Sequence, residues 1–196
     1  MVAGCGSNGA PTRHELIDSR DNYDPRSLDP ALSTDVPTGR AVAYVFDGLT
    51  RFTPEARVEP ALAERWDVSS DGGRYTFHLR HGVTFTDGTP LTAKIVLASW
   101  QRALDPATKG GRAEPLQPIR GAKDFAAGKT KSISGLSAPD DSTVVVQLEE
   151  PLGIFPKLLA MPVASIVAPN MKADHPVADV ILLKGTEWKT VAEKLD

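Results

Sequence analysis

The chain contains a single cysteine among its 196 residues. One thiol excludes a disulfide within the chain and any zinc or redox site built from paired cysteines. Long apolar runs are also missing: the longest, residues 161–168, contains Pro162 and is far shorter than the roughly 20 residues that cross a bilayer. The net charge is −3 and no basic block is interleaved with aromatic residues, so the sequence does not indicate a nucleic-acid partner.

Catalytic and metal-binding motifs are equally scarce. His78 and His81 stand three apart on a predicted strand, which places them on opposite faces, so no histidine metal site is predicted. No GxSxG motif occurs, and the paired acids 140–141 and 149–150 fall at predicted turns or strand ends, where solvated charges are expected. These residues therefore predict no cofactor, no metal site and no enzymatic activity.

The position of the cysteine is informative. Residues 2–5 read Val-Ala-Gly-Cys and precede a small, polar stretch, which resembles the bacterial lipobox ahead of an acylated cysteine. The charged and apolar segments of a signal peptide do not precede it, since only Met1 stands before the tetrad. Two interpretations stay open: Cys5 is a lipidation site that anchors the chain to a membrane, or it is a solvated terminal cysteine.

Apolar periodicity predicts mixed α and β structure. Alternation of apolar and polar residues predicts strands, and the strands at 74–80 and 83–86 are expected to continue into a β-meander. Spacing of three and four residues predicts helices, with Thr38 and Thr92 as candidate caps and Gly48 as a left-handed exit. Further strands are predicted at 143–148 and 163–168, and helices at 38–48, 60–64, 92–104, 119–126 and 158–161.

Two stretches carry a family resemblance. Residues Leu62–Trp66 and Ser70–Ala93 combine a strand, a turn, a second strand, an Asp-Gly turn and a capped helix at fixed spacing. This arrangement is similar to the signature of the family 5 extracellular solute-binding proteins. The similarity runs from about Ser19 to Pro169 and includes the stretches 28–31, 45–49, 121–125, 128–129, 133–136, 140–144 and 148–151.

The resemblance implies an α/β fold of the periplasmic-binding-protein type II, specifically the first lobe of a two-lobed clamshell. Expected units are a lipobox remnant and tether at 1–18, a partial solute-binding lobe at 19–176 and a divergent tail at 177–196. After residue 176 the family continues into a second lobe, whereas this sequence soon ends, so we expect that lobe to be absent. The tail is either a short helix over 186–196 or sequence unrelated to the family.

The resemblance also implies a function. Family members bind di- to oligopeptides outside the membrane and deliver them to the permease subunits of an ABC importer. We expect this chain to do so as a lipid-anchored protein, in the periplasm or on the outer face of the cytoplasmic membrane. By position, Ser33, Thr34, Asp35 and Val36 are the expected ligand-binding segment, and the alternative is an ordinary surface loop. Nickel or another solute stays open as the ligand, and a fragment or stand-alone interaction lobe without transport activity stays open as the function.

Overall fold

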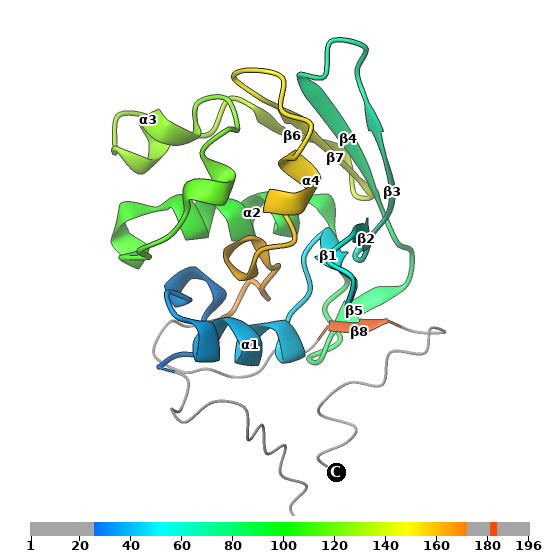
Figure 1. Cartoon of the computed structure of the whole chain (residues 1–196), viewed down its shortest axis with the longest axis vertical. Helices are drawn as coiled ribbons and strands as arrows, with labels where there is room; N and C mark the ends of the chain where they lie inside the picture. Colours follow the sequence, from blue (N-terminus) through cyan, green and yellow to red (C-terminus); the bar gives the residue numbers. More distant parts are fainter. Residues whose placement is uncertain (1–25, 172–180, 184–196) are drawn as a thin grey trace, which may run out of the picture.

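The computed structural model of the chain describes residues 26–171 and 181–183. Figure 1 shows a mixed α/β arrangement in which a twisted sheet occupies the upper part of the view, α1 the lower part, and α2 lies between them. The helices are α1 (Val36–Val45), α2 (Ala93–Leu104), α3 (Ala122–Ala126) and α4 (Phe155–Leu158). Short 3-10 turns are η1 (Pro30–Leu32), η2 (Pro106–Thr108), η3 (Glu114–Leu116) and η4 (Pro162–Ala164).

The main sheet has four antiparallel strands. In pairing order they are β3 (Ala63–Val68), β4 (Arg74–Leu79), β7 (Thr143–Gln147) and β6 (Leu136–Asp140). The predicted alternation in β4 is confirmed, because Tyr75, Phe77 and Leu79 are buried while the residues between them are not. The strand predicted at 143–148 is confirmed as β7, which pairs with β4 and places Val144 opposite Phe77.

Helix α2 packs against this sheet and anchors the core. Thr92 is its N-cap as predicted, and its Oγ1 accepts a hydrogen bond from the backbone N–H of Ile95 at 3.4 Å. Trp100 is fully buried and donates its indole N–H to the backbone oxygen of Ala164 at 3.0 Å. Helix α2 therefore joins the sheet on one side to η4 on the other.

The predicted meander is wrong beyond β4. Strand β5 (Val83–Phe85) pairs with β8 (Ile181–Leu183), and β4 takes β7 as its second neighbour. The chain turns away at Gly82, which has a φ of 73°, and the backbone of Val83 then accepts a hydrogen bond from Leu91. A separate small hairpin pairs β1 (Thr50–Phe52) with β2 (Val58–Pro60).

Three further predictions need correction. Residues 60–64 are not helical: Ala61 and Leu62 donate their backbone N–H groups to the carbonyls of Leu49 and Gly48 and form a bend between β2 and β3. Gly48 is not a left-handed exit from α1; a Cβ there would lie 2.6 Å from the backbone oxygen of Leu159. Residues 163–168 are buried but begin with the 3-10 turn η4 and form no strand.

The two other helix predictions are confirmed in part. Helix α3 covers only 122–126 of the predicted 119–126, because Ile119 instead forms an isolated β-bridge with Leu148. Helix α4 lies at 155–158, so it begins before the predicted turn at 158–161. The tether at 1–18 and the tail at 186–196 lie outside the described residues.

Candidate ligand-binding site

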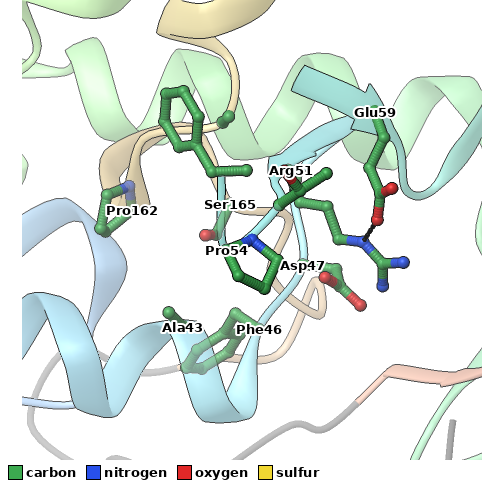
Figure 2. A pocket seen from close by; sticks show the side chains of 12 residues that line it. Ala43, Phe46, Asp47, Arg51, Pro54, Glu59, Pro162 and Ser165 are labelled. Atoms are coloured by element: carbon green, nitrogen blue, oxygen red, sulfur yellow. Dashed lines mark hydrogen bonds and ion pairs between the residues drawn. The ribbon is translucent and has the colours of Figure 1, made fainter. Parts of the chain in front are cut away.

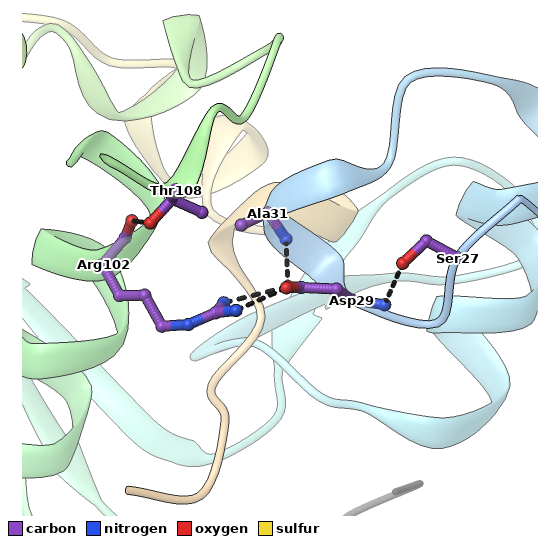
Figure 3. Close-up of polar contacts among 5 residues, drawn as sticks. All are labelled: Ser27, Asp29, Ala31, Arg102 and Thr108. Carbon is purple, nitrogen blue, oxygen red and sulfur yellow. Dashed lines mark hydrogen bonds and ion pairs between the residues drawn. The ribbon is translucent and has the colours of Figure 1, made fainter. Parts of the chain in front are cut away.

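The candidate site begins at a buried carboxylate. Asp29 is only 1% exposed and accepts hydrogen bonds from both terminal nitrogens of Arg102 on α2, with Nη1 2.9 Å from Oδ1 (Figure 3). The Asp29 Oδ1 atom also caps η1 by accepting the backbone N–H of Ala31 at 3.0 Å. The hydrogen bonds that Asp29 accepts raise the pKa of the Arg102 guanidinium. This ion pair fixes η1 to the end of α2.

Glycines bring the following loop close to η1. A Cβ on Gly110 would lie 2.6 Å from the backbone oxygen of Ala31, and one on Gly111 would lie 3.2 Å from the Cγ2 atom of Thr34. Only a residue without a side chain allows this approach of backbone to backbone. The loop after α2 and the segment after η1 are therefore held side by side.

The predicted ligand-binding segment leads into α1. The helix begins at Val36, and its cap is Asp35, whose Oδ1 accepts the backbone N–H of Thr38 at 2.9 Å; the prediction that Thr38 is the cap is wrong. Thr38 is instead buried, and its Oγ1 accepts the backbone N–H of Arg26 at 3.1 Å. The hydrogen bonds from Thr38 lower the pKa of the Asp35 carboxyl.

All four predicted residues line one cavity. The cavity has a volume of about 530 Å³, and we call it the Thr34 pocket. Its lining residues are Ser33, Thr34, Asp35, Val36, Gly39, Arg112, Glu114, Pro115, Met161, Pro162 and Val163. Segments from three parts of the chain, around residues 35, 113 and 162, thus meet at the start of α1.

The Thr34 pocket combines an apolar wall with charged groups. Val36 is 64% exposed and Met161 42% exposed, which is unusual for large apolar side chains that sit beside each other in a cavity. Arg112 and Glu114 contribute a cation and an anion to the same lining. Arg112 makes no ion pair with any other residue in the described part of the chain.

The backbone of the segment is open to a partner. Ser33 and Asp35 have extended conformations, with φ and ψ of −71° and 100° and of −132° and 165°. Between them, neither the N–H nor the C=O of Thr34 hydrogen-bonds to a described residue. A free donor and acceptor on extended backbone are the groups that a strand-like ligand requires.

Sequence reasoning missed the second and third walls of the Thr34 pocket. Arg112 lies in a loop of Gly, Ala and Pro without periodicity, and Met161–Val163 were read as parts of a helix and a strand. The available signal was the Gly-Gly pair at 110–111, which indicates close backbone approach without identifying its partner. Their role follows from tertiary packing alone.

Metal binding, membrane insertion and lipidation are the other properties that the sequence raised. Across 26–171 and 181–183, no three His, Cys, Asp or Glu side chains are placed to hold a metal ion, and His78 instead contacts Asp67 at 2.8 Å. None of the helices in these ranges has the length and apolar character needed to span a membrane. Cys5 lies outside them, so its lipidation stays a prediction.

Comparison with known proteins decides the family. Residues 57–187 match the model of the bacterial extracellular solute-binding proteins, family 5, middle region. The chain belongs to this family. The predicted signature at 62–93 lies inside the match, so the family 5 assignment rests on the same residues that carried the resemblance.

Family 5 relatives agree in sequence and in structure. The chain is 40% identical over 155 residues to the probable deoxycholate-binding periplasmic protein YgiS of Escherichia coli, covering 78% of the chain and 29% of YgiS. It is 32% identical over 200 residues to the oligopeptide-binding protein OppA of Bacillus subtilis, covering 95% of the chain and 37% of OppA. The chain thus spans about a third of the length of these relatives.

Solved family 5 structures show the same fold. The Haemophilus influenzae OppA complex with the peptide RPPGFSPFR superposes with a TM-score of 0.71 at 30% identity, over 74% of this chain and 29% of that one. An oligopeptide ABC transporter substrate-binding domain from Bacillus anthracis gives a TM-score of 0.72 at 33% identity, over 76% and 29%. The mixed α/β arrangement is therefore part of a type II periplasmic-binding-protein fold, as the sequence predicted.

Proposed function

We propose that this chain contributes a solute-binding lobe, over residues 19–176, to the substrate-binding component of a bacterial ABC importer. It holds a peptide outside the membrane for delivery to permease subunits and catalyses no reaction. Membership of a solute-binding family supports the importer role, and relatives named oligopeptide-binding proteins support the ligand class. Lipidation of Cys5 would hold the lobe at the outer face of the cytoplasmic membrane, close to the permease.

The free backbone of Thr34 carries the proposal that the ligand is a peptide. A peptide in extended conformation pairs its own N–H and C=O with such groups, and this pairing is independent of side-chain identity. The apolar wall of the Thr34 pocket, from Val36 to Met161, would then receive one side chain of the peptide. Broad acceptance of peptides follows, because the backbone supplies the hydrogen bonds and the cavity supplies room.

Peptide titration followed by nuclear magnetic resonance tests this proposal. We expect weak binding, in the millimolar range, because the ligand contacts one open wall, with amide shift changes concentrated at 33–36 and 112–114. A peptide methylated on its backbone nitrogens is the matched control ligand and should bind less. The proposal fails if shifts scatter over the surface, or if backbone methylation leaves the affinity unchanged.

A second ligand class is favoured by one observation. Exposed Val36 and Met161 lie in one cavity with Arg112, which is unpaired among the described residues, and this combination suits an amphipathic carboxylate. The E. coli relative at 40% identity is named a probable deoxycholate-binding protein. Deoxycholate should then bind the Thr34 pocket, and Arg112→Gln should weaken deoxycholate binding more than the binding of an uncharged peptide. Equal losses for both ligands would reject this alternative.

A further inference from the structure

A second cavity lies at the other end of α1. It has a volume of about 420 Å³, and we call it the Asp47 pocket. Its walls come from the last turn of α1, the β1–β2 hairpin and the η4 region, and Figure 2 shows the apolar residues on one side and three charged residues on the other. The lining residues are Ala43, Phe46, Asp47, Gly48, Arg51, Phe52, Thr53, Pro54, Glu59, Ala160, Pro162 and Ser165.

The apolar side of the Asp47 pocket is built from rings. Phe46 is buried against the protein core, whereas Phe52 on β1 is 41% exposed at the edge of the cavity. Pro54 and Pro162 complete this wall, and Figure 2 shows Pro54 and Phe46 facing the same space. Such a wall binds an apolar group of a few carbon atoms.

The charged side carries an excess of negative charge. The Nε atom of Arg51 lies 2.6 Å from Oε1 of Glu59, so the two opposite charges form an ion pair and neutralise each other. The remaining group is Asp47, whose carboxylate accepts no hydrogen bond from any residue in the described ranges. The two acids outnumber the single guanidinium, which makes the Asp47 pocket complementary to a cation.

The Asp47 carboxylate is partly shielded from water, and nearby charge only partly offsets this loss of hydration. Burial raises its pKa, and the charge of Arg51 only partly opposes this effect. A partly buried carboxylate normally has hydrogen-bond donors, because an ionised group without them is destabilised. The backbone oxygen of Asp47 accepts the N–H of Ile166 at 2.9 Å, so the backbone of Asp47 is held by the chain while its side chain lines the pocket.

We infer that the Asp47 pocket binds a primary ammonium group attached to a small apolar body. The ammonium donates to the Asp47 carboxylate, and the apolar body packs between Phe46 and Phe52. Glu59 adds a second negative charge at the rim while it stays paired with Arg51. The Asp47 pocket shares only Pro162 with the lining of the Thr34 pocket, and it does not depend on the ligand proposed there. A free amine and the amino terminus of a peptide share this chemistry.

Titration of the complete chain with 2-phenylethylamine tests the inference, with amide shifts as the readout. We expect shifts at 43–54, a stretch that contributes to the Asp47 pocket and not to the Thr34 pocket, and no comparable effect from the neutral isostere 2-phenylethanol. Asp47→Asn should weaken binding at least tenfold, because a charge-assisted hydrogen bond is replaced by a neutral one. Glu64→Gln, which removes an exposed carboxylate on β3 that lines neither pocket, is the matched control and should leave the affinity unchanged.

Two further arms define the source of the ammonium and the role of charge. A Leu-Leu amide and its N-acetylated form differ only in the ammonium group, so selective binding of the first assigns peptide amino termini, and binding of 2-phenylethylamine alone assigns free amines. Protonation of Asp47 removes the negative charge that attracts the ammonium, so the affinity should fall as the pH is lowered through the raised pKa of Asp47. Arg51 and Glu59 are the other charged groups that line the same pocket. Phe52→Ser should reduce affinity several-fold through the apolar wall.

The inference is overturned by any of three results. They are equal binding of phenylethanol and phenylethylamine, unchanged affinity in Asp47→Asn, or shift changes outside the Asp47 pocket.

Discussion

Asp29 and Arg102 lie 73 positions apart in sequence and form a two-pronged ion pair between η1 and the end of α2. The pair determines where the segment after η1 lies, because Asp29 also caps η1 and Arg102 belongs to the last turn of α2. The position of the candidate segment 33–36 therefore depends on an ion pair outside it.

Removing one partner of this pair tests that relationship. Arg102→Met leaves the 1% exposed carboxylate of Asp29 without its counter-ion, and we expect a loss of about 3–5 kcal/mol in the free energy of unfolding. Denaturant unfolding measures the change. Arg120→Met removes an exposed guanidinium of the same kind and should cost much less. Equal effects of the two substitutions would show that the ion pair has no special role.

The cap of α1 predicts a dependence of stability on pH. Hydrogen bonds from Thr38 lower the pKa of Asp35 in the folded protein, so its contribution is complete above the unfolded value, about 3.9, and is lost as the pH falls through the lower folded value. Asp35→Asn lacks this titration. The melting temperatures of wild type and Asp35→Asn should therefore converge on acidification, and a constant difference would contradict the assignment of the cap.

Ser99 on α2 holds the residues that follow η4. Its Oγ accepts the backbone N–H of Val167 at 3.1 Å and donates to the carbonyl of Ile95 at 2.9 Å. Ser99→Ala leaves a buried N–H without an acceptor, and we expect a loss of about 1–3 kcal/mol by denaturant unfolding. Ser137→Ala on exposed β6 should change stability by well under 1 kcal/mol. A similar value for both would show that the Val167 bond is dispensable.

Gly48 tests the contact between α1 and α4. A Cβ at this position meets the backbone oxygen of Leu159 at 2.6 Å, which neither partner can avoid without a backbone shift. Gly48→Ala should therefore lower stability by about 1–3 kcal/mol, as overpacking does. Gly153→Ala introduces the same methyl group where nothing lies within 4 Å and serves as the control. A stable Gly48→Ala variant would place the two segments farther apart than described.

Sequence patterns correctly predicted the strands and helices whose formation depends on residues close together in the chain. The alternation from Tyr75 to Leu79 predicted β4, and the Thr92 cap predicted the start of α2. Both signals depend only on the spacing of apolar and capping residues that are close together in the sequence. The stretch 60–64 was mispredicted, since its hydrogen bonds go to residues 48 and 49 and its sequence has no feature that names them. Long-range pairing decided that segment.

The same limit applies to the candidate site. The family resemblance placed the ligand at Ser33–Val36, and the structure brings these four residues into one cavity. Arg112 and Met161 were beyond prediction, because they reach the cavity through the packing of η3 and η4 near η1. Asp47 gave no sequence signal either, since a single acid at a helix end is common and only its burial distinguishes it.

The backbone of Thr34 is the proposed peptide-binding group, and substitution at this position tests it most directly. Thr34→Pro removes the N–H of residue 34, and the extended conformation of Ser33 is the one that precedes proline; Thr34→Ala changes the side chain and keeps the N–H. Peptide affinity measured by amide shift titration should be lost in Thr34→Pro and retained in Thr34→Ala. Retention of affinity in Thr34→Pro, or its loss in both variants, would contradict the account.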